Sequence, residues 1–183
     1  MNGYLRFTFI VLFMKSKYLK AYMQTAEIFA ELSSAKRLHV GAIVVKDDRI
    51  ISIGYNGMPS GWENDCETVE WCSAGGWLSP DEIEEQWPFT GTYKDVDGNE
   101  IQGNYRLISK PEVLHAESNA ISKLAKSSES GDGAYMFITH APCLDCAKLI
   151  HQSGINHVYF GKHYRDSAGI DFLTKCKVEI TQL

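Results

Sequence analysis

Residues 134–161 read AYMFITHAPCLDCAKLIHQSGINHVYFG. The two apolar runs in this segment, 134–139 and 157–161, predict strands, and residues 143–152 between them predict a helix. Helix and strand continue to alternate on either side, with a helix expected at 115–127. Such alternation indicates a sheet that is parallel in this part of the chain and covered by helices on both faces.

Two further elements complete the C-terminal half, a helix at about 167–175 and a strand at 177–181. In the N-terminal half, residues 17–33 have apolar side chains every three or four positions, which predicts a helix with one face on the core. The β-branched runs 40–45 and 50–55 flank a polar turn, as in a hairpin. We therefore expect an α/β fold, a three-layer α/β/α sandwich whose mixed sheet has about five strands, antiparallel where the hairpin joins it.

A long segment at about 65–112 interrupts this pattern. It is rich in tryptophan and acidic residues and has no sustained period. We expect an insertion with at most short elements, within a single domain at 15–183, because 183 residues is close to one domain length. A loop this long inside a domain is uncommon unless it is functional, so we expect it to fold over a ligand or to lie at a subunit contact.

Residues 1–14 are expected to be an N-terminal extension, with Met14 as the natural start. Their apolar run, 4–14, is shorter than the roughly 20 residues that a membrane-spanning helix needs. It is followed by Lys15-Ser16-Lys17-Tyr18 and not by a small-residue cleavage site. We predict no membrane partner; an interfacial or oligomer-contact arm is the alternative interpretation of this stretch.

Charge and cysteine content exclude further classes of protein. Eighteen Lys and Arg against 23 Asp and Glu give a formal net charge of -5, the wrong sign for a protein that gains affinity by neutralising a phosphate backbone. We therefore expect no nucleic-acid partner. Of the five cysteines, Cys143 and Cys146 form a tight pair, spaced for a metal and not for a disulfide framework. This usage indicates a reducing, cytoplasmic compartment.

Two motifs contain the residues of a metal site, His115-Ala116-Glu117 and Pro142-Cys143-Leu144-Asp145-Cys146. One imidazole and two thiolates are three of the four tetrahedral ligands that zinc prefers, and a site with three protein ligands leaves the fourth position to water. Both motifs open a predicted helix, Pro142 suits the first turn of one of them, and the positive end of that helix favours thiolates. We predict one catalytic zinc ion held by His115, Cys143 and Cys146.

Glu117 has the position of a proton carrier beside such an ion. Zinc lowers the pKa of bound water to about 7, and a carboxylate outside the coordination shell can accept the proton and deliver it again. The order His-x-Glu and then Pro-Cys-x-x-Cys is the signature of zinc deaminases, in which the hydroxide attacks the amino-bearing carbon of a base. Each half alone is weakly informative, but a redox pair at Cys143 and Cys146 would leave Glu117 without a role.

From about residue 19 to 176, outside the insertion, the chain resembles the cytidine and deoxycytidylate deaminase family. The resemblance rests on VGAIVV at 40–45, GYNGMPSG at 54–61 and HAESNAI at 115–121, with further support after Cys146. The loop at 54–61 is similar to that of the deoxycytidylate (dCMP) deaminases, including those of large phages. The resemblance implies a cytidine deaminase-like fold, hydrolysis of dCMP to dUMP and ammonia, which supplies dUMP for dTMP synthesis, and Glu117 as the proton shuttle.

The resemblance also implies substrate-binding residues. Asn56 is expected to hydrogen-bond the sugar 3′-hydroxyl, although an Asn-Gly turn made for its backbone is the alternative. Ala116 is taken as a second substrate-binding residue, and Tyr164 is a candidate to stack on or border the pyrimidine, or else to pack in the core. Independently, a phosphate needs cationic or N–H donors, for which Lys36 and Arg37 are the candidates; a solvated basic turn is the alternative.

For regulation and assembly, the resemblance implies activation by dCTP, inhibition by dTTP, Mg2+ accompanying these triphosphates, and a homo-oligomer, commonly a hexamer. Some phage relatives hold a second, structural zinc ion in the insertion. Cys66 and Cys72 are present here, but residues 73–114 contain neither His nor Cys. We therefore expect one zinc ion per chain. If the chain is viral, its compartment is the host cytoplasm.

Several alternative functions stay open at this point. A deaminase that also acts on dCTP is hard to exclude, because the added phosphates reach toward solvent and the insertion. A tRNA adenosine deaminase shares the zinc signature but should be basic, and free-nucleoside cytidine deaminases usually have Cys in place of His115. A non-catalytic zinc module would not need Glu117.

Overall fold

A five-stranded sheet forms the centre of the computed structural model, which describes residues 14–73 and 77–183. The strand order is β2-β1-β6-β7-β8. The strands are β1 (Gly41–Lys46), β2 (Arg49–Tyr55), β6 (Tyr135–His140), β7 (His157–Lys162) and β8 (Glu179–Gln182). β1 is antiparallel to β2 and β6, whereas β7 is parallel to β6 and β8. The predicted mixed sheet is confirmed.

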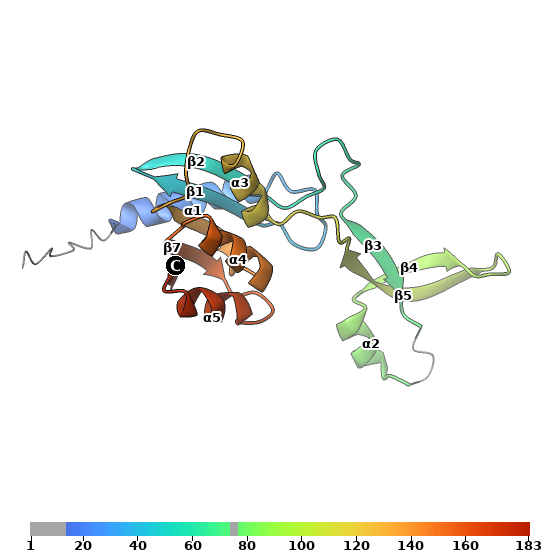
Figure 1. The fold of residues 1–183 in the computed structure, drawn as a ribbon. Helices are drawn as coiled ribbons and strands as arrows, with labels where there is room; N and C mark the ends of the chain where they lie inside the picture. The colour runs from blue at the N-terminus through green and yellow to red at the C-terminus, as the bar shows by residue number, and fades with distance from the viewer. Residues whose placement is uncertain (1–13, 74–76) are drawn as a thin grey trace, which may run out of the picture.

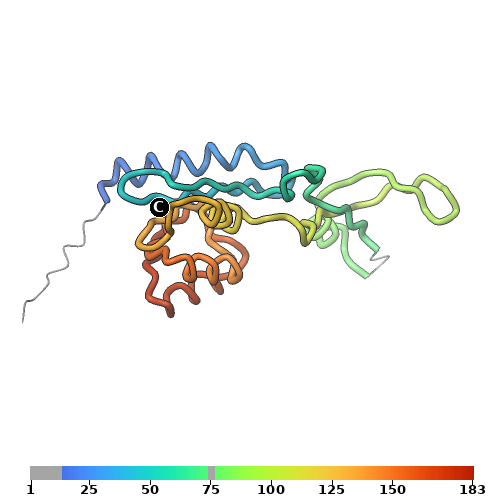
Figure 2. Tube along the Cα trace, turned by 45° about the horizontal axis from the view of Figure 1, so that its top comes forward, coloured from blue at the N-terminus to red at the C-terminus, as the bar shows by residue number. Residues whose placement is uncertain are grey.

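Helices cover both faces of this sheet. α1 (Ser16–Ala30) lies along one face, and α3 (Ala116–Leu124), α4 (Leu144–Gln152) and α5 (Ala168–Lys175) cover the other (Figure 2). The alternation of side chains along β1 explains both layers, because successive residues of a strand point to opposite faces. Ile43 and Val45 pack with α1, while Ala42 and Val44 pack with α3 and α4. The three-layer α/β/α sandwich is therefore as predicted.

Most predicted elements lie within two residues of their observed bounds. The helices expected at 17–33 and 115–127 end three residues early, at Ala30 and Leu124. After Ala30, the N–H groups of Leu32 and Ser33 donate to carbonyls three residues back, which tightens the last turn and ends the helix. Residues 1–13, which make up nearly all of the expected extension, lie outside the described part of the chain. Within the described part, no helix has the length and apolar character needed to cross a bilayer.

The described residues of the segment 65–112 form an arm that projects from the rest of the molecule, here called the body (Figure 1). The expectation of at most short elements is wrong for this segment. It contains β3 (Glu67–Trp71), α2 (Pro80–Gln86), β4 (Phe89–Lys94) and the ten-residue β5 (Glu100–Ser109), and its strands form an antiparallel sheet in the order β3-β5-β4.

Aromatic rings over paired glycines stabilise the arm. Gly91 of β4 pairs with Gly103 of β5, and the rings of Trp71, Tyr93 and Tyr105 cross this glycine pair. A Cβ at Gly91 would come within 3.2 Å of Trp71 and Tyr105. Among the described residues from 68 to 112, none is buried. The strands therefore lack the apolar alternation by which sequence analysis finds a half-buried sheet.

Candidate active site

Two helix starts bring the predicted metal ligands together. His115 is the N-cap of α3, Cys143 is the N-cap of α4, and Cys146 lies in the first turn of α4. β6 ends directly before α4, so the group lies at the carboxyl end of a central strand, where α/β folds commonly bind ligands. Pro142 lies one residue before the N-cap and not in the first turn as predicted, because Cys143 still has extended backbone angles.

The three ligand atoms have the spacing that zinc requires. His115 Nδ1 lies 3.5 Å from Cys143 Sγ and 3.4 Å from Cys146 Sγ, and all three ligand atoms lie within 4.8 Å of one another. Zn–N and Zn–S bonds of about 2.1 and 2.3 Å at a tetrahedral angle would separate N and S by about 3.6 Å. The donor set and its geometry therefore fit a zinc ion with three protein ligands.

Hydrogen bonds within this group shift the pKa of each ligand. Those with Cys146 and then His115 lower the pKa of the Cys143 thiol to about 4. The bond with Cys143, together with burial, raises the pKa of Cys146, and the bond with Cys143 also raises the pKa of His115. The raised pKa values mean that Cys146 and His115 hold protons more tightly without a metal ion. Zinc binding must release these protons, since zinc binds thiolates and neutral imidazole.

Glu117 is a buried carboxyl group beside this cluster. It is one of the first residues of α3 and is only 4% exposed. Burial raises its pKa to about 7, because removal from water penalises the charged form. A carboxyl group with a pKa near neutrality can both take up and release a proton at physiological pH.

A cleft of 880 Å³ opens in front of the cluster. Its walls include seven of the nine residues predicted for the site: Arg37, Asn56, His115, Ala116, Glu117, Cys143 and Tyr164. Cys146 lies behind them, nearly buried. Lys36 is exposed and does not line the cleft, and its charge acts on Asp65 of the arm.

Asn56 is engaged within the fold as well as exposed to the cleft. Its Oδ1 accepts from the backbone N–H of Val40, and its Nδ2 donates to the carbonyl of Leu38, both at 2.8 Å. Ser33 Oγ donates to the carbonyl of Asn56. An amide has a second N–H and a second lone pair, so Asn56 can hold segment 38–40 and still bind a hydroxyl group.

Several cleft residues were missed by sequence analysis. Arg165 stands beside Tyr164, with its guanidinium 5.3 Å from the ring centroid. Its charge only partly opposes the rise in the pKa of His115 that the hydrogen bond with Cys143 causes. His140 at the end of β6 also faces the cleft. Arg165 could have been suspected as a cation next to the predicted Tyr164. The arm residues on the cleft wall are Glu67 and residues 108–111, and nothing in the local sequence indicated that they line the cleft.

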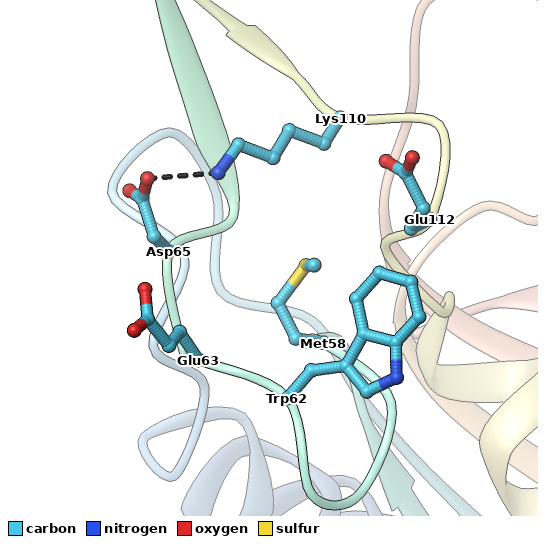
Figure 3. A pocket seen from close by; sticks show the side chains of 6 residues that line it. All are labelled: Met58, Trp62, Glu63, Asp65, Lys110 and Glu112. Atoms are coloured by element: carbon cyan, nitrogen blue, oxygen red, sulfur yellow. Dashed lines mark hydrogen bonds and ion pairs between the residues drawn. The ribbon is translucent and has the colours of Figure 1, made fainter.

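A smaller pocket of 450 Å³ lies where the arm meets the body (Figure 3). In this view the ammonium of Lys110 points toward Asp65, and Met58 lies between that pair and the indole of Trp62. The Lys110–Asp65 ion pair, 2.8 Å long, joins the two ends of the arm. Its hydrogen bond lowers the pKa of Asp65 and raises that of Lys110.

The model of the cytidine and deoxycytidylate deaminase zinc-binding region matches residues 16–162. The chain belongs to this deaminase family. It is 36% identical over 150 residues to the deoxycytidylate deaminase of Enterobacteria phage T4, which covers 78% of this chain and 76% of the relative. It is 32% identical over 148 residues to the human deoxycytidylate deaminase, with 80% and 66% of the two chains covered.

The structural comparison agrees with the sequence comparison. The dCMP deaminase of the cyanophage S-TIM5, crystallised in complex with dCMP and dUMP, is 40% identical and superimposes with a TM-score of 0.70 over 93% of this chain and 99% of its own. The predicted family and the cytidine deaminase-like fold are therefore confirmed, and this deaminase-family chain is an enzyme.

Proposed function

We propose that this enzyme hydrolyses dCMP to dUMP and ammonia. One observation carries the proposal: the buried carboxyl of Glu117 lies beside the His115, Cys143 and Cys146 group in a cleft, in a chain 40% identical to a dCMP deaminase crystallised with dCMP and dUMP. A non-catalytic zinc module would gain nothing from a buried carboxyl with a pKa near 7.

The metal proposed for the site is a single zinc ion held by His115, Cys143 and Cys146. When bound, it supplies a water molecule whose pKa is lowered to about 7. Glu117 would accept a proton from this water as the water oxygen adds to C4 of the cytosine, and would pass it to the ring nitrogen. It would then carry a second proton from the added hydroxyl group to the amino group, which leaves as ammonia. Water and dCMP are thereby converted to dUMP and ammonia with no other reactant.

The remaining cleft residues bind and orient the nucleotide. Asn56 offers its free amide hydrogen or lone pair to the sugar 3′-hydroxyl. Tyr164 borders the pyrimidine beside the zinc group, and Ala116 lines the wall between His115 and Glu117. Arg37 is the proposed phosphate partner, since a guanidinium matches phosphate oxygens. Lys36 keeps at most a long-range role because it lies outside the cleft lining.

The test is a comparison of ammonia release from dCMP, dCTP, CMP and deoxycytidine by the zinc-loaded enzyme, with an adenosine-containing RNA as the nucleic-acid control. We expect the highest kcat/KM with dCMP. Equal turnover of dCTP would make the monophosphate assignment too narrow. If none of the four nucleotides or nucleosides releases ammonia, the proposal fails.

Regulation and assembly form a second part of the proposal. We expect dCTP with Mg2+ to activate the enzyme, dTTP with Mg2+ to inhibit it, and the enzyme to form a homo-oligomer, with a hexamer as the expected state in the cytoplasm. Titration of each triphosphate at subsaturating dCMP, and mass measurement in solution, test these points. A monomer at micromolar concentration would contradict the assembly and leave the chemistry untouched.

A further inference from the structure

Glu67, the first residue of β3, is a buried carboxylate that the mechanism does not use. It is 6% exposed and lies on the wall of the active-site cleft. Burial of a carboxylate is costly unless hydrogen bonds compensate it. Its Oε1 accepts from the backbone N–H groups of Lys36 at 2.9 Å and Arg37 at 3.2 Å. The arm is therefore hydrogen-bonded to the body at residues 36–37, which include Arg37, the proposed phosphate ligand.

The side chain of Arg37 is held by the opposite strand of the arm. Its Nη1 donates to Ser109 Oγ at 3.1 Å, and Ser109 of β5 is the ladder partner of Glu67. Across residues 14–73 and 77–183, Arg37 takes part in no ion pair. One hydrogen bond thus orients the exposed guanidinium on the cleft wall and leaves it donors for an anion.

The same segment is joined to the sugar-binding side of the cleft. Leu38 and Val40, which follow Arg37, are hydrogen-bonded to the side chain of Asn56. Ser34, on the other side, lies 3.4 Å from the thiol of Cys66 at the base of the arm. Residues 34–40 are therefore held by hydrogen bonds to the arm on one side and to Asn56 on the other. The position of Arg37 depends on both sets of contacts.

We propose that Glu67 and Ser109 are positioning residues, which hold Arg37 where it binds the nucleotide phosphate. The inference rests on the proposed function, because it assumes a substrate with a phosphate group. It gives the arm a role in substrate affinity without contact to the reacting atoms. A pre-set guanidinium loses less freedom when the phosphate binds, and binding is stronger for that reason.

The test measures kcat and KM of zinc-loaded variants with dCMP and with deoxycytidine, which lacks the phosphate. Loss of a charge-assisted contact is expected to raise KM for dCMP by roughly 10- to 100-fold in Arg37→Ala. Glu67→Ala should raise the same KM by about 10-fold with kcat nearly unchanged. Neither change should alter kcat/KM for deoxycytidine. Glu67→Gln keeps an oxygen acceptor for the two N–H groups and should retain most of the affinity.

Two comparisons separate positioning from a general structural role. In the Arg37→Ala background, Glu67→Ala should add little, because residues that act through one contact are not additive. Glu70→Ala removes a carboxylate on the same strand that is exposed and pairs with Arg106, and it should leave KM for dCMP unchanged. If Glu67→Ala folds poorly, Ser109→Ala replaces it, with an expected rise in KM of about threefold for the loss of one hydrogen bond.

Two results would overturn the inference. One is an equal loss of kcat/KM for dCMP and deoxycytidine in Glu67→Ala and Ser109→Ala. The other is an unchanged KM for dCMP in Arg37→Ala. In either case, turnover of dCMP by the unmodified enzyme would still support the proposed function, whereas absence of that turnover would refute the proposed function itself.

Discussion

Gly54 of β2 lies directly against the backbone of Ala116 in α3. A Cβ at position 54 would overlap the carbonyl oxygen of Ala116 and come within 2.6 Å of the backbone nitrogen of Ala120. Neither obstacle is a side chain, so neither can rotate away. This contact fixes the distance between the hairpin and α3, the helix that follows the N-cap residue His115 and carries Glu117.

Gly54→Ala should therefore destabilise the enzyme. Overpacking of this kind costs about 1–3 kcal/mol, which corresponds to a fall in Tm of roughly 2–10 °C for a chain of this size. Gly57→Ala is the matched control, because the nearest atom to its added Cβ is Ser34 Oγ at 3.9 Å. Equal Tm values for the two variants in thermal unfolding would contradict the prediction.

Cys143→Ala should lose most of the zinc. Its thiol is one of the three proposed ligands, and the remaining pair, His115 and Cys146, would not complete a tetrahedral site. Elemental analysis of the purified protein measures the effect. Cys72→Ser is the control, since the thiol of Cys72 lies outside the ligand group. Stoichiometric metal in Cys143→Ala would show that zinc is held elsewhere.

Glu117→Gln should retain zinc and lose activity. The amide preserves the size of the side chain but cannot transfer a proton, and general acid–base groups contribute typically 10²- to 10⁴-fold to the rate. We expect a fall in kcat with dCMP of at least this size at unchanged zinc content. Near-normal turnover by the zinc-loaded variant would remove Glu117 from the mechanism.

Asn56→Ala should reduce both stability and substrate affinity. The change removes two hydrogen bonds that hold Leu38 and Val40, at a cost of about 1–3 kcal/mol. If Asn56 also binds the sugar, KM for dCMP rises beyond what the loss of stability explains. Comparison of dCMP with its 3′-deoxy analogue decides this point: the variant should discriminate less between the two than the unmodified enzyme does.

Stability should fall in mild acid, partly because of His157. Burial lowers its pKa, and the opposing charge of Glu179 does not offset this effect. The unfolded chain therefore binds a proton at His157 near pH 6.5 that the folded chain binds only at lower pH, so stability is lost as the pH falls below about 6.5. Thermal unfolding at several pH values should show a weaker decline for His157→Gln. An identical decline in both proteins would contradict the assignment.

The grouping of His115, Cys143 and Cys146 beside Glu117 was predictable because each half of it is local in sequence. His115 with Glu117, and Cys143 with Cys146, lie within one helical turn, and a helix start points such side chains into one pocket. The sheet was predictable for a similar reason, since β1 and β6 are buried on both faces and read as continuous apolar runs.

The strands of the arm were not predictable in the same way. They bury too little apolar surface to show alternating apolar and polar residues in the sequence. Two local signals were nevertheless present. Ser79 and Glu82 form a capping box around Pro80, which starts α2. Asp97 and Gly98, the latter at φ +86°, lie in the turn that connects β4 to β5. The contribution of Glu67 and Ser109 to the cleft depends on contacts between residues 30 and 72 positions apart in sequence, which no local pattern encodes.

The two strands that connect the arm to the deaminase body, β3 and β5, first pair where Glu67 lies opposite Ser109. Opposite Cα atoms in an antiparallel pair are about 5 Å apart, a gap that a two-residue turn can close. The length of the arm beyond this residue pair consequently does not affect the geometry of the proposed zinc ligands. A shortened chain in which such a turn replaces residues 70–106 would keep the Glu67–Ser109 pair, the hydrogen bonds of both residues to Arg37, and the helices α3 and α4. The arm can therefore be deleted, exchanged or extended beyond Val69 and Leu107.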